Sequence, residues 1–480
     1  MLPPVIVWFR RDLRLEDHPA LAAAAATGRP LIPLLIEETD RPEAETNGAA
    51  ARWARHQAVT SLAAALEQQG LRLLLRRGPA AAVLDEVIAA SGADTVLWNR
   101  RYTPGGVACD RAIKAALTER GLTVHSFKAT LLFEPWEITT RAGGPFRVFT
   151  PFWRACQAAP LPDRPLPAPT ALVPFPHPLE SETLTEWGWL PTAPDWAGGL
   201  RAAWLSGSAQ TRLASFLDQA LADYATGRDQ LGRAGTSRLS PVLAWGELSP
   251  RTLFHAVRDA APAGDGPDRF LAELGWREFC AHLLFQAPDL AEQPLRPAFA
   301  AFPWVDDPAG LVAWQRGQTG YPLVDAGMRE LRTTGWMHNR ARMVTASFLV
   351  KDLLISWCQG AAWFAETLVD ADPASNPASW QWVAGCGADA APFFRIFNPT
   401  RQGETFDPDG AYVRRWCPEL AALPDRWLHQ PGAAPAAVLR QAGVRLGQTY
   451  PLPIVEHDTA RRRALAAMEK CHGEAAARGL

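Results

Sequence analysis

Cysteine is scarce in this chain and follows neither a metal-binding nor a disulfide pattern. The seven cysteines are Cys109, Cys156, Cys280, Cys358, Cys386, Cys417 and Cys471. Their number is odd and no Cys-x-x-Cys pair occurs, whereas zinc sites and disulfide frameworks need closely spaced or paired cysteines. We therefore expect no disulfide framework and no metal site, and a reducing cytoplasm as the location.

An excess of charge of one sign is also missing. The chain has 48 Lys and Arg residues against 50 Asp and Glu residues, a net charge of −2. A nucleic-acid site would therefore have to be a local basic patch. No stretch is apolar for long enough to span a bilayer, and the first residues lack the apolar core of a signal peptide. No membrane partner is expected.

The first 130 residues predict a doubly wound parallel α/β domain, because apolar strands alternate with Ala-rich amphipathic helices. The predicted strands are Val5–Phe9, Leu31–Ile36, Arg72–Leu75, Thr95–Trp98 and Thr123–Phe127. No Gly-x-Gly-x-x-Gly motif follows the first strand, which argues against a dinucleotide bound in the Rossmann manner.

The remaining chain predicts a different organisation. A length of 480 residues exceeds what one compact core usually supports. Residues 131–205 contain a Pro-rich stretch and are predicted to be an interdomain linker. Residues 206–480 show helical periodicity and almost no strand pattern, so they are predicted to form an all-α domain.

Tryptophan is the residue in excess, with 20 copies, and two of them lie in the segment Asp370–Trp382. This Pro-interrupted segment, predicted as a loop, also carries Asp370, Asp372 and Asn376. Carboxylates, an amide and indoles are costly to bury together without a ligand. The segment therefore indicates an aromatic cofactor with a polar edge, and chemistry that moves electrons.

A second group of polar side chains lies in the segment 235–241. Ser240 precedes Pro241, a pattern typical of a helix N-cap followed by the first helical residue. The hydroxyls of Thr236, Ser237 and Ser240, with Arg238, would suit a phosphate. The alternative is a capped helix whose hydroxyls face solvent, and the segment alone favours it.

A third group lies on the predicted helix that follows Gly335. Asn339, Arg342 and Met343 are spaced to share one helix face. The face would either contact a cofactor or form a partly buried helix in which Arg342 pairs with a carboxylate such as Asp370, and both can hold together. His338 has no second ligand at metal spacing, so zinc is excluded there.

Glu273, Trp276 and Arg277 form a fourth group with the spacing of one helix face. Together they would bind a nucleobase through hydrogen bonds and stacking. The commoner alternative is an intrahelical pair between Glu273 and Arg277 beside a core indole.

Residues 394–404 are predicted to be a tight loop with polar side chains outward. Arg401 and Gln402 would then touch phosphates, or the segment is a plain surface turn.

Taken in order along the chain, these segments resemble the photolyase/cryptochrome family. The matching stretches are residues 7–15, 149–153, 236–240, 335–340, 380–382 and 395–399. The resemblance covers nearly the whole chain. It implies an α/β antenna domain followed by a helical domain that binds FAD in a U shape.

The resemblance also implies roles for individual residues. Asn376 would face flavin N5, and Trp380, Trp357 and Trp304 would conduct electrons between flavin and surface. The implied FAD-binding residues are Tyr224, Thr236, Ser237, Arg238, Leu239, Ser240, Arg277, Trp336, Asn339, Arg342, Asp370, Asp372 and Asn376.

Within the family, the motifs look most like class I photolyases that repair cyclobutane pyrimidine dimers. The positions of Asn339 and Met343 usually hold His in (6-4) photolyases, and Asn376 is of the repair type. The implied reaction is light-driven: excited FADH⁻ gives an electron to a dimer flipped out of UV-damaged DNA. Glu273, Asn339, Met343 and Asn376 would be catalytic, with a protonated Glu273 donating a hydrogen bond to the dimer.

The same resemblance implies a DNA-binding set. The residues are Glu273, Trp276, Asn339, Arg340, Trp382 and Gln402, with Arg342 as a further contact to the DNA backbone. A monomer is expected.

Three alternatives stay open at this point: a cryptochrome-type photoreceptor, a flavoprotein acting in the dark, and a pure DNA-binding module. A second, antenna chromophore also stays open. Residues 98–106 lack the acidic pattern that binds folate in some relatives, so methenyltetrahydrofolate, a deazaflavin or no antenna are all compatible with the sequence.

Overall fold

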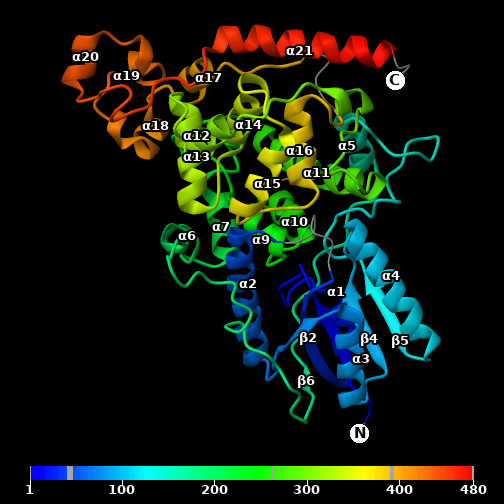
Figure 1. Cartoon of the computed structure of the whole chain (residues 1–480). Helices are drawn as coiled ribbons and strands as arrows, with labels where there is room; N and C mark the ends of the chain where they lie inside the picture. The colour runs from blue at the N-terminus through cyan, green and yellow to red at the C-terminus, as the bar shows by residue number, and fades with distance from the viewer. Residues whose placement is uncertain (1, 41–46, 262, 390–393, 478–480) are drawn as a thin grey trace.

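The computed structural model describes residues 2–40, 47–261, 263–389 and 394–477. A parallel sheet with its helices forms one end of the molecule, and a larger helical body forms the other (Figure 1). The C-terminal helix α21 (His457–Ala477) runs across the far side of the helical body. The expected fold class, a parallel α/β part followed by a helical part, is confirmed.

The sheet has the strand order β3-β2-β1-β4-β5, and all its pairs are parallel. Its strands are β1 (Val5–Phe9), β2 (Pro30–Glu38), β3 (Leu74–Gly78), β4 (Thr95–Asn99) and β5 (Thr123–Phe127). The order reverses between β1 and β4, as in a doubly wound sheet. All five predicted strands exist, but β3 begins two residues later than predicted because its hydrogen-bonded register with β2 starts at Leu74.

The helices around the sheet are α1 (Pro19–Ala25), α2 (Ala49–Gln68), α3 (Ala80–Ser91) and α4 (Pro104–Glu119). Buried apolar strand residues meet the apolar faces of these helices on both sides of the sheet. Burial on both faces explains why the strands are continuous apolar runs rather than alternating ones.

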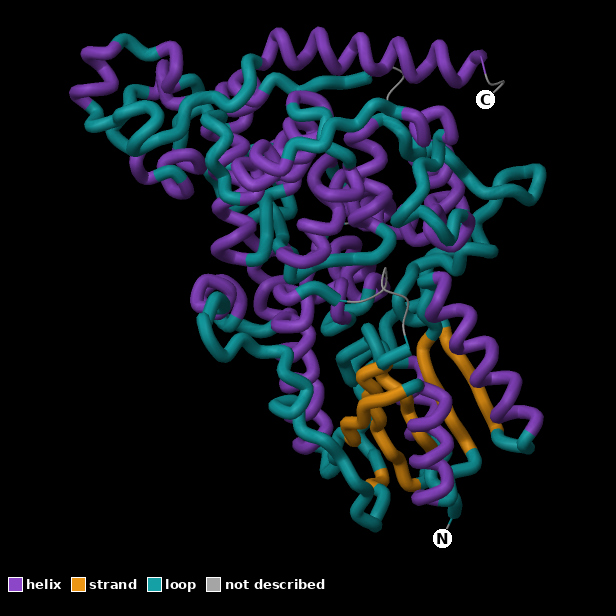
Figure 2. The backbone as a smooth tube through the Cα atoms, viewed as in Figure 1, coloured by secondary structure: helices purple, strands orange, loops and turns teal. Residues whose placement is uncertain are grey.

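Residues 131–205, predicted as a linker, contain three short elements. Helix α5 (Phe149–Ala158) packs on the helical body, strand β6 (Val173–Pro174) pairs with β2, and α6 (Gly198–Trp204) packs on the helical body. Between them the Pro-rich chain runs over the surface as a long loop (Figure 2). The predicted domain boundaries at residues 130 and 205 stay a prediction.

The helical body follows from residue 209. Its elements are α7 (Ala209–Gln219), α8 (Tyr224–Gly227), α9 (Ser240–Trp245), α10 (Pro250–Ala260), α11 (Asp265–Gln286), η2 (Pro297–Ala301), α12 (Pro308–Gln315), α13 (Pro322–Thr334), α14 (Asn339–Ser347), η3 (Phe348–Asp352), α15 (Trp357–Thr367), α16 (Ser375–Ala384), α17 (Pro399–Phe406), α18 (Ala411–Trp416), η4 (Pro418–Leu420), α19 (Asp425–Leu428), η5 (Pro431–Ala433) and α20 (Ala436–Gln441).

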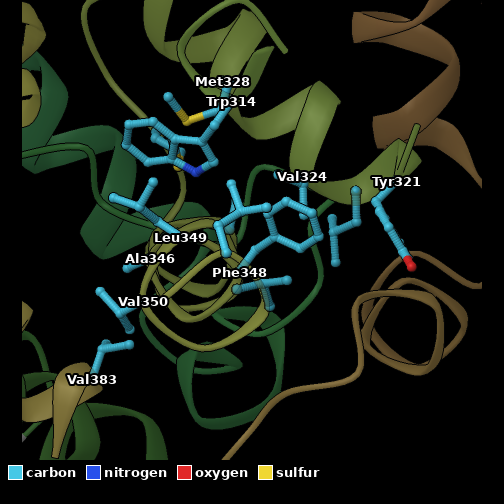
Figure 3. Close-up of a cluster of buried hydrophobic side chains, with 14 of the residues drawn as sticks. Trp314, Tyr321, Val324, Met328, Ala346, Phe348, Leu349, Val350 and Val383 are labelled. Atoms are coloured by element: carbon cyan, nitrogen blue, oxygen red, sulfur yellow. The ribbon is translucent and has the colours of Figure 1, made fainter. Parts of the chain in front are cut away.

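The centre of this body is a hydrophobic core built on α13, α14 and the π-helix η3. Trp314, Phe348 and Leu349 are fully or almost fully buried there, and Figure 3 shows their side chains converging with those of α13. The indole N–H of Trp314 donates to the carbonyl of Thr345 at 2.9 Å, so its polar atom is satisfied inside the core. This core fixes the helices that carry the site.

A buried ionic contact joins the sheet end to the helical body. Asp17, which is fully buried, accepts bonds from Arg251 Nε at 3.1 Å and from its terminal nitrogen at 2.5 Å. Nearby, Arg14 donates to the carbonyls of Gly246 and Ala129 at 2.9 and 3.1 Å. Because an unpaired buried charge is costly, these contacts hold the two ends in one arrangement.

Candidate active site

A cavity of about 460 Å³ opens in the helical body, between helices α11, α14 and α16. We call it the central cavity. Twelve residues singled out by the sequence line it: Ser240, Glu273, Trp276, Arg277, Asn339, Arg342, Met343, Asp370, Asp372, Asn376, Trp380 and Trp382. Its volume lies within the range of small-molecule and cofactor sites.

Helix α11 supplies the carboxylate of Glu273 to the cavity wall. Arg228 forms an ion pair with this carboxylate, and Arg269, one turn earlier on α11, lies 3.6 Å away. The intrahelical pair with Arg277 considered from the sequence does not form, since Arg277 lies 3.1 Å from Glu278 instead. Two guanidiniums therefore flank the Glu273 carboxylate at the cavity wall.

The pairing of Arg342 with Asp370, considered from the sequence, is present. A terminal nitrogen of Arg342 lies 2.8 Å from Asp370 Oδ2, and Arg342 Nε donates to the carbonyl of Met337 at 2.8 Å. The other carboxylate oxygen, Asp370 Oδ1, is buried and has no partner within the described residues. Asn339 begins α14 and is exposed at the cavity rim, with its amide 4.0 Å from Met343 Sδ.

The segment Asp370–Trp382, predicted as a loop, is mostly helical from Ser375 onward. Asp372 Oδ1 accepts from the backbone N–H of Ala374 and of Ser375 at 3.1 and 2.7 Å, which satisfies donors at the start of α16. The loop prediction failed because Pro377 lies near the helix start, where the missing N–H has no helical partner to lose. On the helix, Asn376 Nδ2 donates to the carbonyl of Ala361 at 2.9 Å.

The three indoles of the expected electron path lie in one part of the helical body. The ring of Trp380 is buried and contacts Phe364 at 5.0 Å and Trp314 at 6.1 Å between centroids. Its rim lies against Gly360 of α15, where a Cβ atom would overlap the ring. Trp357 begins α15 and Trp304 contacts Phe302 at 4.4 Å; among the described residues no ring contact joins the three indoles directly. The path stays a prediction.

The segment 235–241 differs in detail from the prediction. Ser240 is the first residue of α9 and Leu239 is the cap, because Pro241 fits the second helical position as well as the first. Arg238 has a positive φ of 51° and its guanidinium lies 4.8 Å from the ring centroids of both Trp204 and Trp336. Thr236 and Ser237 are half-buried beside it.

The remaining predicted residues lie around the central cavity rather than in its lining. Tyr224 is buried against Phe270 at 5.2 Å, and the indole N–H of Trp336 donates to Ser240 Oγ at 3.2 Å. Arg340 pairs with Asp229 at 2.7 Å.

Residues 394–404, predicted as a tight loop, contain the start of helix α17. Asn398 caps this helix through a 3.1 Å bond from the N–H of Arg401. Gln402 therefore lies on the first turn of a helix, and its Oε1 is buried without a partner in the described chain. The Asn398-Pro399 pair was interpreted as a turn, but Asn is also a common helix cap and Pro a common first helical residue, which is how both are used here.

The residues present fit an aromatic cofactor with phosphates and a hydrogen-bonding edge. Asp370 Oδ1 and Arg238 Nε are buried polar atoms for which the described residues offer no partner. Buried acceptors and donors normally have hydrogen-bond partners. A bound ligand could therefore donate to Asp370 Oδ1 and accept from Arg238 Nε. Indole faces and methionine sulfur supply the apolar surface of the same region.

Sequence reasoning missed Arg228 and Arg269, which flank Glu273. The i, i+4 spacing of Arg269 and Glu273 was a usable signal, whereas Arg228 is 45 positions away and gave none. A second cavity was missed as well. It has a volume of about 480 Å³ and lies beside the central cavity, with Trp53, Trp204 and Trp245 in its lining.

No group of three or more His, Cys, Asp or Glu side chains among the described residues is arranged to hold a metal ion. No helix in the described ranges has the length and apolarity needed to cross a membrane.

The chain matches two family profiles: "DNA photolyase" over residues 5–170 and "FAD binding domain of DNA photolyase" over residues 270–470. It is 52% identical to a deoxyribodipyrimidine photo-lyase of Agrobacterium fabrum, over 97% of both chains. It is 40% identical to cryptochrome-1 of Arabidopsis thaliana, over 97% of this chain and 70% of the relative.

Among solved structures, a class III photolyase from Agrobacterium tumefaciens is similar with a TM-score of 0.95 and 50% identity, over 98% of each chain. An archaeal photolyase from Sulfolobus tokodaii that holds two FAD molecules is similar with a TM-score of 0.80 and 27% identity, over 97% of this chain and all of the other.

This chain belongs to the photolyase/cryptochrome family. Its expected assignment to the DNA photolyases, a class of lyases, is confirmed, and residues 270–470 form a family FAD-binding domain.

Proposed function

We propose that this protein repairs cyclobutane pyrimidine dimers in UV-damaged DNA, using light. The observation that carries the proposal is the lining of the central cavity. A carboxylate and an indole, Glu273 and Trp276, line it together with Arg342, Asp370 and Asn376. The first pair suits a nucleobase, and the other three suit a flavin.

For the cofactor, we propose that Arg342 and Asp370 hold the polar edge of FAD. When bound and reduced, FAD would supply the light-driven electron that opens the cyclobutane ring and would take it back afterwards. Asp370 Oδ1 is the unpartnered acceptor for a ring N–H, and Asn376 offers an amide from the wall formed by α16. The segment 236–240, with Arg238, is the proposed phosphate and ribitol contact.

For the lesion, we propose stacking on Trp276 and Trp382, with Glu273 and Asn339 at the base edges. The proposed role of Glu273, which lies between Arg228 and Arg269, is a hydrogen bond to the edge of the dimer. Flipping a lesion out costs least where stacking and pairing are already poor, which favours damaged bases. Arg340 and Gln402 would contact the DNA backbone beside the cavity.

The test is light-dependent loss of dimers from a defined oligonucleotide, by the purified protein with its FAD. Repair under blue light and none in the dark is expected. Bound FAD without repair would contradict the proposal and favour a cryptochrome-type receptor. The 40% identity to Arabidopsis cryptochrome-1 supports this alternative. The motifs resemble class I enzymes; we infer class III from the 50% identity to the Agrobacterium tumefaciens structure.

We also propose that Trp380, Trp357 and Trp304 carry electrons to the flavin from the surface. Trp380 lines the central cavity, Trp357 is the first residue of α15, and Trp304 lies in the loop after η2. Trp380→Phe is expected to remove most of the light-driven reduction of bound FAD, followed by its absorption. Trp196→Phe, at an exposed indole outside the cavity, is the matched control.

A second chromophore is proposed for the second cavity. Three indoles line it, and Arg212 lies 5.1 Å over the ring of Trp204. Flat aromatic walls with a cation suit a planar, polar-edged ring system. Methenyltetrahydrofolate, a deazaflavin and a second flavin all have this chemistry. The absorption spectrum of the purified protein, before and after denaturation, distinguishes them.

A further inference from the structure

Helix α5 forms part of the support of Trp276, although its residues lie in the segment predicted as a linker. Phe149, the first residue of α5, stacks on the Trp276 ring with 3.9 Å between centroids and 10° between planes. Phe149 is buried, with 8% of its surface exposed. One face of Trp276 is therefore fully occupied by protein.

A third ring continues the same set of planes. Trp153, one helical turn after Phe149, lies 6.4 Å from it with 8° between planes. The Trp153 ring also lies against Gly275, where a Cβ atom would overlap it, so α5 and α11 approach closely at this point. We call Trp153, Phe149 and Trp276 the aromatic ladder.

The edge of Trp276 is also constrained. Phe279 contacts it edge to face at 5.8 Å and 75°, and Phe279 itself contacts Phe149 at 6.0 Å and 67°. With one face stacked and one edge blocked, the indole can present only its other face to the central cavity, which it lines. Rings held in this way lose little conformational freedom when a ligand stacks on them.

The chain just before α5 is hydrogen-bonded to a segment next to the central cavity. The backbone N–H of Asp389 donates to the carbonyl of Arg147 at 3.1 Å, two residues before Phe149. Phe149, Phe152 and Cys156 are the buried residues of α5, spaced to form one helix face. The buried face of α5 and the backbone bond before it therefore fix the position of the Phe149 ring.

We propose that Phe149 is a positioning residue that fixes the plane of Trp276 and thereby sets the preference for dimers over undamaged bases. This inference rests on the proposed function, in which the lesion stacks on the free face of Trp276. A tilted indole would still offer apolar area, but it would no longer match the fixed plane of a base whose edge meets Glu273. Phe149 itself does not line the central cavity.

The test is a double-mutant cycle on the full-length, FAD-loaded protein. The affinity for an oligonucleotide with one thymine dimer is compared with that for the undamaged oligonucleotide. Phe149→Leu is expected to reduce the preference for the dimer about 3- to 10-fold, the size of one aromatic pair. Phe149→Tyr, which keeps the ring, is expected to retain it. In a Trp276→Ala background, Phe149→Leu is expected to change nothing further.

Two controls separate positioning from general damage to the fold. Phe146→Leu removes a ring from the same segment that contacts Phe152 edge to face at 6.1 Å and is not stacked on Trp276, so the dimer preference is expected to stay. FAD content and thermal stability are measured for every variant.

Three outcomes overturn the inference, and they differ in what they leave standing. If Trp276→Ala lowers the dimer preference but Phe149→Leu does not, or if the two effects add fully, the positioning role is wrong while the proposed lesion site stands. If Trp276→Ala leaves the dimer preference unchanged, the proposed lesion stacking is wrong and the inference falls with it.

Discussion

The two cavities have similar volumes, about 460 and 480 Å³, but their walls have different origins. Every described residue that lines the central cavity lies between positions 228 and 388, mostly on α11, α14 and α16. The second cavity draws its walls from both ends of the molecule, including the loop after β1, helix α2, helix α7 and Val369. The first is therefore a property of one body, and the second depends on how two parts meet.

A shared wall separates them. Val369 lines the second cavity and the next residue, Asp370, lines the central one. The indole N–H of Trp245 holds the Val369 carbonyl at 3.0 Å, and the Val369 N–H donates to Gly335 at 2.8 Å. A ligand in either cavity would therefore contact the same short piece of fixed backbone.

The largest expected effect comes from breaking the ion pair in the central cavity. Arg342→Ala leaves the buried Asp370 carboxylate without its partner, so the free energy of unfolding is expected to fall by about 3 kcal/mol. FAD content is expected to fall with it. Denaturant unfolding and flavin absorption measure the two effects. Arg332→Ala, at an exposed position on α13, is the control, and unchanged stability in Arg342→Ala would contradict the role of the pair.

Removing Glu273 is expected to act on the lesion alone. Glu273→Ala is expected to weaken dimer binding by about 10- to 100-fold, the size of one hydrogen bond to a charged group. FAD content and second-cavity binding are expected to stay. A binding titration and a repair quantum yield measure this, with the exposed Glu67→Ala as control. If affinity and yield both stayed at wild-type values, the role of Glu273 would be wrong.

Removing Trp204 is expected to act mainly on the second cavity. Trp204→Ala is expected to weaken binding of a second chromophore about tenfold, since it deletes one stacking wall. FAD content is expected to fall much less, because Trp204 does not line the central cavity and meets the proposed FAD contacts only through Arg238. Loss of FAD together with the second chromophore would show that the two cavities are not independent. Trp196→Ala is the matched control.

The smallest effect is expected from pH, at Glu247 in the second cavity. Burial raises the pKa of Glu247 to about 7, and Arg212 opposes this only in part. The folded state therefore keeps a proton that the unfolded state has already lost, so stability falls as the pH rises from about 4.5 to about 7.

The measurement is the free energy of unfolding at pH 4.5 and pH 8. A pKa raised from about 4.5 to about 7 would be worth about 3 kcal/mol in full. Because Glu247 is only partly buried and solvent screens it, wild type is expected to lose about 1–2 kcal/mol relative to Glu247→Gln over this interval. Parallel curves for the two proteins would contradict the raised pKa. Glu67→Gln, at an exposed carboxylate outside both cavities, controls for the loss of a charge.

The central cavity could be predicted from the sequence because its residues recur at helical spacing on a few segments. Asn339, Arg342 and Met343 needed only the period of a helix to be grouped on one face. The sheet was predictable for a similar reason, since doubly buried strands are continuous apolar runs.

The second cavity could not be predicted, because nothing local joins Trp53 to Trp204 or Trp245. Their proximity follows from the packing of α2 against α9 and against α6, which is long-range. Phe149 under Trp276 was hidden for the same reason: the two residues lie 127 positions apart. Pro377 led to the opposite kind of error. Its local preference predicted a loop, whereas the structure has the start of helix α16 there.

Gly360 leaves no room for any side chain between α15 and the ring of Trp380. A glycine inside a helix costs roughly 1 kcal/mol relative to alanine, yet here it lets an indole rest directly on the backbone of α15. The smallest possible side chain at this position would overlap the ring, so the separation between α15 and the indole cannot be tuned by gradual substitution. Any change at residue 360 must displace Trp380 or α15 itself.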